Sequence, residues 1–324
     1  MPTYTVLVTD YAWPTLDTER EILQTINADL LVAETGDEAE LLRLAPQADA
    51  ILTNWQQVTA VVLQAAPRCR VVSRYGVGVD NIAVDEATQR GIVVTNVPDY
   101  CMEETSDHAL ALLLACARRL WPLLKATKSG DWDLQSDQPY FRLRGRTLGL
   151  VGYGRIAQAL VPKAQAFGLR VVAYTPRLTA VQVAPGVEVT NDLHDLLRQA
   201  DFVSLHAPAT AETKHLINAE ALRQMKPTAY LINTARGALV DEAALYTAVS
   251  ENWIQGAALD VLQTEAPHTH NPLLALDNVI VTPHAAFYSR EAIAELTRKA
   301  AQNVVAVLQN KRPRYVVNAA VFEL

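Results

Sequence analysis

The chain has 324 residues, of which 50% are hydrophobic and 19% are charged. One domain takes about 150 residues, so this length predicts two domains with large buried cores, and the composition excludes a disordered chain. Lys and Arg number 28 while Asp and Glu number 35, which gives a net charge of −7. Because nucleic acids select basic surfaces, we expect no nucleic-acid partner.

Three features of the sequence bear on the cellular compartment of the protein, namely its hydropathy, its first residues and its cysteines. No run approaches the ~20 apolar residues that span a bilayer, so we expect no membrane partner. Residues Met1–Thr5 lack the basic and then apolar build of a signal peptide. The three cysteines are odd in number and have no metal-ligand spacing. We expect a cytoplasmic globular protein without a metal site.

Short apolar runs alternate with helical patterns along the chain, which predicts parallel sheets with helices on both faces. The early strands are expected at Thr5–Thr9, Leu30–Ala33, Ala50–Thr53, Val71–Ser73 and Ile92–Thr95. A long helix is expected from about Met102 to Lys125 and a final one from about Arg290 to Leu308. The later strands are expected at Thr147–Val151, Arg170–Tyr174, Val187–Val189, Phe202–Leu205, Ala229–Asn233, Ala257–Val261 and Val279–Val281. This pattern predicts two doubly wound units joined near residue 100, each with its own sheet.

Residues Ser129–Arg146 interrupt the alternation. The stretch is polar and aromatic and has no clear period. An irregular segment of this length within a compact domain is either a surface loop or an element of a subunit interface. We favour the subunit interface.

A glycine-rich turn follows the strand predicted at Thr147–Val151. The run Gly152-Tyr-Gly154-Arg-Ile-Ala157 leads into an amphipathic helix and then into a second strand. Gly152 would allow the tight turn, Gly154 would let a pyrophosphate approach the backbone, and Ala157 would keep helix and strand close. A glycine triplet alone also occurs in ordinary surface turns. In this strand–turn–helix–strand context it predicts a dinucleotide site at the helix N-terminus.

The end of the second strand bears on which dinucleotide binds. A carboxylate about 20 residues after the glycine loop would bind the ribose 2′-hydroxyl of NAD. This chain has Thr175-Pro176-Arg177 there instead. Thr175 and Arg177 can bind a 2′-phosphate through a hydrogen bond and a charge, which favours NADP(H). The alternative is that Arg177 is an exposed turn residue and that NAD binds through other contacts.

Three further segments follow predicted strands of the second sheet, at the edge where open α/β folds place ligands. They supply Arg236, Glu265 and His284. An arginine can hold a substrate carboxylate, a histidine can exchange a hydroxyl proton, and a nearby carboxylate can orient the histidine ring. For each residue taken alone, a structural role is the favoured interpretation. Together they favour hydride transfer at a hydroxy or oxo acid.

Four sequence motifs follow one another along the chain in a characteristic order. They are Gly152-x-Gly154-x-Ile156-Ala157, Asn233-Thr-Ala-Arg236-Gly237, Leu259-Asp260-Val261 with Glu265-x-Pro267, and Thr282-Pro283-His284. In this order the chain resembles the D-isomer-specific 2-hydroxyacid dehydrogenases nearly from end to end. Within that family it looks most like the C-terminal-binding-protein-like branch, with which it shares Asn96–His108 and His284–Ser289. The resemblance implies an α/β fold of two doubly wound parallel-sheet domains. A Rossmann-type dinucleotide-binding domain, residues 101–289, would be inserted in a flavodoxin-like substrate-binding domain, residues 1–100 and 290–324.

The resemblance also implies residue roles. His284 would be the general acid/base, Glu265 its partner and Arg236 the substrate-binding arginine, while Asp260 would hold the nicotinamide carboxamide. The expected cofactor-binding residues are Thr105, Gly152, Gly154, Arg155, Ile156, Thr175, Arg177, Pro208, Thr213, Thr234, Arg236, Asp260 and His284. The expected substrate-binding residues are Arg74, Tyr75, Gly76, Val77, Gly78 and Phe287. Gly76-Val77-Gly78 would offer N–H groups to the substrate carboxylate, and Arg74 would either add a charge or pair with Asp80.

Two functions from different classes remain at this point. The leading one is an NAD(P)-dependent D-2-hydroxyacid dehydrogenase, a homodimer in which Ser129–Arg146 would form the dimer arm. Its substrate would be a small 2-oxo or 2-hydroxy acid. The alternative is a dinucleotide-sensing, corepressor-like interaction protein without significant turnover. The complete set of Arg236, Glu265 and His284 favours the enzyme.

Overall fold

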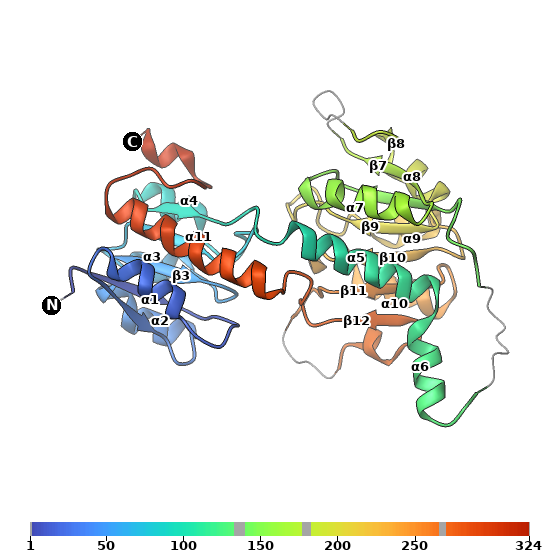
Figure 1. The fold of residues 1–324 in the computed structure, drawn as a ribbon, viewed down its shortest axis with the longest axis horizontal. Coiled ribbons are helices and arrows are strands. Elements are labelled where there is room, and N and C mark those ends of the chain that lie inside the picture. Colours follow the sequence, from blue (N-terminus) through green and yellow to red (C-terminus); the bar gives the residue numbers. More distant parts are fainter. Residues whose placement is uncertain (1, 133–139, 177–182, 266–269, 324) are drawn as a thin grey trace. The chain divides into compact units, whose positions relative to one another are not determined.

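The computed structural model describes residues 2–132, 140–176, 183–265 and 270–323. The chain forms two compact units, which are described separately below (Figure 1). Unit 1 comprises Met1–Cys101 and Tyr288–Leu324, and unit 2 comprises Met102–Phe287. These bounds lie one and two residues from those expected from the sequence. Unit 2 is a continuous stretch of chain, whereas unit 1 is built from both ends.

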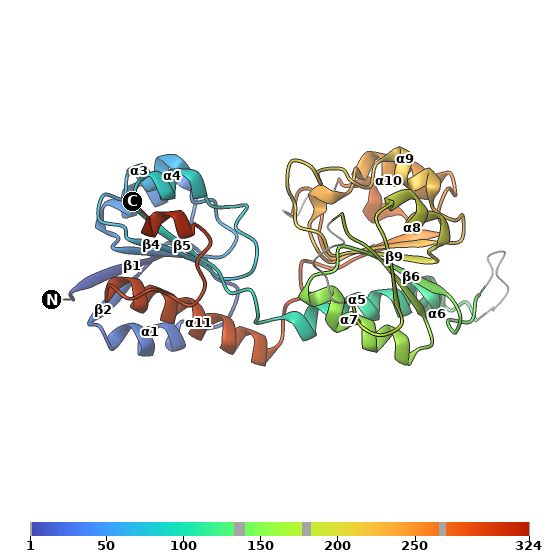
Figure 2. The ribbon, with the colours of Figure 1, turned by 90° about the horizontal axis from the view of Figure 1, so that it is seen from above.

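Unit 1 contains a five-stranded parallel sheet in the order β2-β1-β3-β4-β5. This is the flavodoxin-like order. The strands are β1 (Tyr4–Val8), β2 (Ala28–Val32), β3 (Ala50–Thr53), β4 (Val71–Arg74) and β5 (Val93–Thr95). The helices are α1 (Asp17–Gln24), α2 (Glu38–Leu44), α3 (Ala60–Gln64), α4 (Val84–Gln89) and α11 (Arg290–Leu308), with 3₁₀ turns η1 (Ala45–Gln47) and η5 (Ala319–Phe322). Figure 2 shows α1 and α11 along one face of the sheet and α3 and α4 along the other.

Unit 2 contains a seven-stranded sheet in the order β12-β11-β10-β9-β6-β7-β8, and every pair is parallel. The strands are β6 (Thr147–Val151), β7 (Arg170–Tyr174), β8 (Val187–Thr190), β9 (Phe202–Leu205), β10 (Tyr230–Asn233), β11 (Gly256–Leu259) and β12 (Val279–Val281). Counted from β6, this is the Rossmann order with one strand added beside the sixth. The strand order reverses between β6 and β9, and ligands of such folds bind beyond the carboxyl ends of the strands at that point.

The helices of unit 2 cover both faces of its sheet (Figure 2). They are α5 (Met102–Ala117), α6 (Leu120–Lys128), α7 (Arg155–Ala166), α8 (Leu193–Gln199), α9 (Ala219–Gln224) and α10 (Glu242–Ser250), with 3₁₀ turns η3 (Gly237–Leu239) and η4 (Pro272–Ala275). Helices α5 and α7 pack on one face, where Leu148 and Leu150 of β6 meet Leu160. Helices α8, α9 and α10 pack on the other, where Val203 and Leu205 of β9 are buried. Burial on both faces explains why the strands are uninterrupted apolar runs.

The predicted strands all occur, with ends that differ from expectation by at most two residues. The long helix predicted over Met102–Lys125 is wrong, because the chain forms α5 and α6 with a break between them. Arg119 at the break has a left-handed backbone, with φ of 51°. Pro122 lies in the first turn of α6 and has no N–H to donate to the carbonyl of residue 118, with which its ring would also collide in a continuous helix. The break removes that conflict.

Among the described residues, no helix combines the length and the apolar character needed to cross a bilayer. Their His, Cys, Asp and Glu side chains also form no group of three or more suited to a metal ion.

Candidate active site

The ends of β10, β11 and β12 are joined by backbone hydrogen bonds into one edge of the seven-stranded sheet. The N–H of Asp260 donates to the carbonyl of Asn233 at 2.8 Å, and the N–H of His284 donates to the carbonyl of Asp260 at 2.8 Å. Arg236, Glu265 and His284 all lie on the segments that follow these strands. Their placement at a carboxyl edge agrees with a ligand site of an open α/β sheet.

His284 and Glu265 are in direct contact. Nδ1 of His284 lies 2.6 Å from Oε2 of Glu265, and the two side chains are 23% and 34% exposed. Because a carboxylate only accepts, Nδ1 carries the hydrogen and the ring orientation is fixed. The Nε2 atom is then the one that can exchange a proton with a substrate. The ring of Phe287 meets the His284 ring edge-on, with centroids 6.2 Å apart.

Arg236 lies on a tight turn after β10. The Asn233 side chain closes this turn, because its Nδ2 donates to the carbonyl of Arg236 at 2.9 Å and its Oδ1 accepts from the N–H of Ala235 at 3.0 Å. Nη1 of Arg236 donates to the carbonyl of Ala235 at 2.8 Å, and the side chain is half-buried. Gly237 lets its backbone pass close to the backbone of Leu262, because a Cβ at position 237 would lie 2.0 Å from the carbonyl carbon of Leu262.

The glycine turn after β6 has the shape of a dinucleotide cradle. Gly152 has φ of +95°, and a Cβ on it would lie 2.7 Å from the carbonyl oxygen of His206, so only glycine fits there. Gly154 is the N-cap of α7, and a Cβ on it would meet nothing within 4 Å. The first N–H groups of α7, including those of Arg155 and Ile156, are left for an anion at that open side.

Strands of the same sheet lead into four other residues expected at the cofactor, namely Thr175, Pro208, Thr213 and Thr234. Thr175 follows β7 and is buried, and the hydroxyl of Thr213 donates to the carbonyl of Pro208 at 2.7 Å. Thr234 is buried after β10, and its hydroxyl has no hydrogen-bond partner among the described residues. Thr105 is buried in α5, and Arg177 lies outside the described residues. The open helix start and the unpartnered Thr234 hydroxyl fit a bound dinucleotide.

The expected substrate loop of unit 1 follows β4. Arg74 is buried, and its Nη1 donates to the carbonyl of Tyr75 at 2.5 Å. Tyr75 is fully buried and donates its hydroxyl to Oε1 of Glu19 at 3.1 Å, inside the unit. Gly76 has φ of +147°, and a Cβ there would collide with the Arg74 guanidinium. The side chain of Val77 is exposed, and Gly78 is half-buried.

Several residues near the site were not identified from the sequence. His206 at the end of β9 is buried, burial lowers its pKa to about 4, and its Nε2 lies 2.9 Å from the Ser204 hydroxyl. His108 of α5 lies with Nε2 at 3.0 Å from the hydroxyl of Thr282. Asp260 was expected to hold a carboxamide, and its carboxylate already accepts hydrogen bonds from the chain itself. Apart from the contact between His206 and Ser204, which are two residues apart, these contacts join segments far apart in sequence, so spacing alone gives no signal for them.

Comparisons with known proteins agree with this geometry. A family profile described as "D-isomer specific 2-hydroxyacid dehydrogenase, NAD binding domain" matches residues 110–286. The chain is also 42% identical over 307 residues to the glyoxylate reductase of Thermofilum pendens, with 91% of this chain and 90% of the relative covered. The chain belongs to the D-isomer-specific 2-hydroxyacid dehydrogenase family.

Solved structures of similar proteins match this chain over nearly its full length. An NADPH-dependent glyoxylate/hydroxypyruvate reductase from Sinorhizobium meliloti, in complex with NADP and malonate, is 31% identical with a TM-score of 0.86, and 97% of this chain and 96% of that chain are covered. A D-lactate dehydrogenase from Aquifex aeolicus, complexed with NAD and lactic acid, is 29% identical with a TM-score of 0.84 and covers 94% and 96%. This dehydrogenase therefore interconverts a 2-oxo acid and a D-2-hydroxy acid with a nicotinamide dinucleotide.

Proposed function

We propose that His284, Glu265 and Arg236 carry the reaction of this dehydrogenase. The observation that carries the proposal is the contact of 2.6 Å between Nδ1 of His284 and the Glu265 carboxylate, which leaves Nε2 for the substrate oxygen. In the reducing direction the His284 ring donates a proton to the carbonyl oxygen, and in the oxidising direction it takes the hydroxyl proton. The guanidinium of Arg236 binds the substrate carboxylate.

The bound nicotinamide dinucleotide would supply or accept the hydride. The cradle at Gly152 and Gly154 would hold its diphosphate at the start of α7, together with Arg155 and Ile156. The further cofactor contacts that we propose are Thr105, Thr175, Arg177, Pro208, Thr213, Thr234, Arg236, Asp260 and His284. Substrate contacts are proposed at Arg74, Tyr75, Gly76, Val77, Gly78 and Phe287. Tyr75 would act there through its backbone, because its side chain is buried within unit 1.

We propose a small 2-oxo acid as substrate and NADP(H) as the preferred cofactor. Glyoxylate and hydroxypyruvate are the first candidates, since the Thermofilum and Sinorhizobium proteins are named for them. Thr175, rather than a carboxylate, follows β7, so no negative charge at this position would repel a 2′-phosphate. NAD(H) remains the alternative, with Arg177 as an exposed turn residue.

The test is a panel of 2-oxo acids assayed with NADPH and, separately, with NADH. We expect turnover of at least one small acid and a higher kcat/KM with NADPH, because Thr175 and Arg177 would bind the 2′-phosphate. Loss of absorbance from the reduced cofactor measures both. A higher kcat/KM with NADH would contradict the cofactor preference. Tight cofactor binding without turnover of any acid would contradict the catalytic roles. It would favour the sensing alternative, which nothing in the relatives named above supports.

We also place the chain in the C-terminal-binding-protein-like branch and in the cytoplasm. The shared segments Asn96–His108 and His284–Ser289 support the branch. Cys69, Cys101 and Cys116 are buried free thiols, and such thiols suit a reducing compartment.

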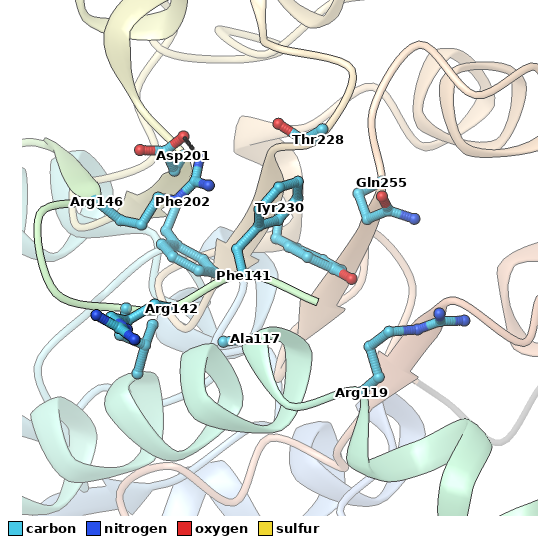
Figure 3. A pocket seen from close by; sticks show the side chains of 11 residues that line it. Ala117, Arg119, Phe141, Arg142, Arg146, Asp201, Phe202, Thr228, Tyr230 and Gln255 are labelled. Atoms are coloured by element: carbon cyan, nitrogen blue, oxygen red, sulfur yellow. Dashed lines mark hydrogen bonds and ion pairs between the residues drawn. The ribbon is translucent and has the colours of Figure 1, made fainter. Parts of the chain in front are cut away.

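We infer further that the dehydrogenase is a homodimer, with Ser129–Arg146 as the dimer arm and α6 of unit 2, which precedes it, as part of the same interface. Leu120, Trp121 and Leu124 on this short helix are 45%, 48% and 55% exposed. A second copy is the occupant we propose, because three large apolar side chains on one exposed helix are typical of an interface. Within Ser129–Arg146, residues 133–139 lie outside the described residues, and Arg146 at the end of the segment is anchored to its own unit. Arg146 stacks over the Phe141 ring and pairs with Asp201 at 3.1 Å (Figure 3).

Light scattering coupled to gel filtration tests the dimer. We expect the mass of two chains for the wild type and of one chain for Leu124→Glu, because a charge on α6 would have to be buried in the interface. Val61→Glu is the matched control, since Val61 is 53% exposed on α3 of unit 1. It should remain a dimer. A single-chain mass for the wild type would refute the inference.

A further inference from the structure

The carboxylate of Asp260 is buried beneath the loop that carries His284. Its side chain has no exposed surface. Oδ1 accepts from the N–H of Ala285 at 2.9 Å, and Oδ2 accepts from the N–H of Ala286 at 2.8 Å. The backbone of Asp260 holds the same loop, because its carbonyl accepts from the N–H of His284. One residue at the end of β11 thus fixes three consecutive N–H groups after β12.

This loop needs such restraint because His284 has a left-handed backbone. Its φ is +52°, a conformation that is unfavourable for residues other than glycine and that persists only where the surroundings enforce it. Released from the Asp260 bonds, the backbone of His284 would relax toward negative φ. The ring would then turn away from Glu265, with which it makes a single hydrogen bond.

A chain of hydrogen bonds fixes Asp260 itself. The hydroxyl of Thr282 donates its only proton to Oδ1 of Asp260 at 2.5 Å. Nε2 of His108 lies 3.0 Å from the same hydroxyl oxygen. Since the Thr282 proton is already used, Nε2 of His108 carries a hydrogen. Its acceptors are the Thr282 oxygen at 3.0 Å and Oδ1 of Asp260 at 3.5 Å, so His108 also contacts Asp260 directly. His108 belongs to α5, which packs on β10 and β11, so the chain ties the loop to a rigid helix.

We propose that His108 and Thr282 are positioning residues for the acid/base histidine. His108 orients the Thr282 hydroxyl, Thr282 orients the Asp260 carboxylate, and Asp260 holds His284 in its left-handed conformation with Nδ1 on Glu265. The proposal rests on the catalytic role proposed for His284. It gives Asp260 a task within the chain that is separate from any contact with the cofactor.

Paired substitutions test this chain of hydrogen bonds. Thr282→Val and His108→Leu remove the hydrogen bonds at nearly constant volume, whereas Thr282→Ser and His108→Gln keep a hydroxyl and an N–H donor. We expect Val and Leu each to lower kcat by about tenfold or more, since small misplacements of a catalytic group are costly. Ser and Gln should keep most of the activity. Thr247→Val, on an exposed part of α10, is the matched control for the threonine change.

Three measurements separate positioning from general destabilisation. They are kcat and KM with the acid turned over fastest in the panel, the dissociation constant of NADPH by fluorescence titration, and the melting temperature. The proposal expects a fall in kcat with an unchanged dissociation constant. In the double variant His108→Leu/Thr282→Val, the loss should equal that of one single variant, because both act through one chain.

The proposal is overturned if Thr282→Val and His108→Leu leave kcat unchanged. It is also overturned if Thr282→Ser and His108→Gln lose as much activity as those two variants. Additive losses, or losses confined to the melting temperature or to NADPH affinity, also overturn it. His284→Ala is assayed beside these variants. If that protein retains turnover, the catalytic role of His284 fails. If it is inactive while Val and Leu remain fully active, only the positioning role fails.

Discussion

Alanine at position 284 lowers kcat by about 10²–10⁴-fold, the range expected for loss of a general acid/base. The side chain that contacts Glu265 at 2.6 Å is the proposed proton donor, and no water held at that position has the same basicity or orientation. Steady-state rates with NADPH and the best acid of the panel measure the loss. The dissociation constant of NADPH should stay close to that of the wild type, because the cradle at Gly152 is unchanged.

The control for this variant is His194→Ala. His194 lies in the first turn of α8, directly after β8, and β8 is at the opposite edge of the sheet from β12, so the loss of His194 should leave kcat unchanged. Retention of wild-type kcat by His284→Ala would refute the acid/base role. An equal loss in both variants would point to a general effect of the substitution on folding.

The second large effect is expected at Gly152. In Gly152→Ala, the alanine would have to adopt a φ of +95°, and its Cβ would lie 2.7 Å from the carbonyl oxygen of His206. Backbone strain of this kind costs on the order of 1–3 kcal/mol, so we expect a lower free energy of unfolding and loss of dinucleotide binding. Chemical denaturation and fluorescence titration with NADPH measure the two effects.

Gly154→Ala tests cofactor binding separately from the stability of the fold. A Cβ at position 154 meets no protein atom within 4 Å, and the backbone there is extended, so the fold should be unaffected. The added methyl group instead lies where the diphosphate would approach, and NADPH affinity should fall. If Gly154→Ala binds NADPH as tightly as the wild type does, the proposed diphosphate site at Gly152 and Gly154 is refuted. Equal stability of Gly152→Ala and the wild type would contradict the strain argument.

The strands and the glycine turn could be predicted from the sequence because both depend on local patterns. Parallel strands buried on both faces are continuous apolar runs, and the turn at Gly152 is marked by its spacing from β6. The break between α5 and α6 was missed, although Pro122 was visible. Proline is tolerated in a first turn, so its position alone does not locate a helix start.

Predicting the site from the sequence was limited by contacts between distant segments. The motifs placed Glu265 and His284 on neighbouring loops, and the structure brings them into contact. The link from His108 to Asp260 through Thr282 joins a helix to two strand ends, and only the packed sheet brings them together. Tyr75 was expected at the substrate site, but its side chain is fully buried and donates its hydroxyl to Glu19 in α1. Burial raises the pKa of Glu19.

The interrupted course of unit 1 has a consequence for synthesis on the ribosome. Helix α11 buries Leu296, Ala300 and Val304, and the Ser73 hydroxyl of β4 donates to its Ala300 carbonyl at 3.1 Å. Chains emerge from the N-terminus, so β1 to β5 leave the ribosome long before the helix that covers them. The inserted unit can fold as soon as Phe287 is free. We therefore expect the nascent chain to carry one finished domain and one with an apolar face exposed to chaperones until α11 arrives.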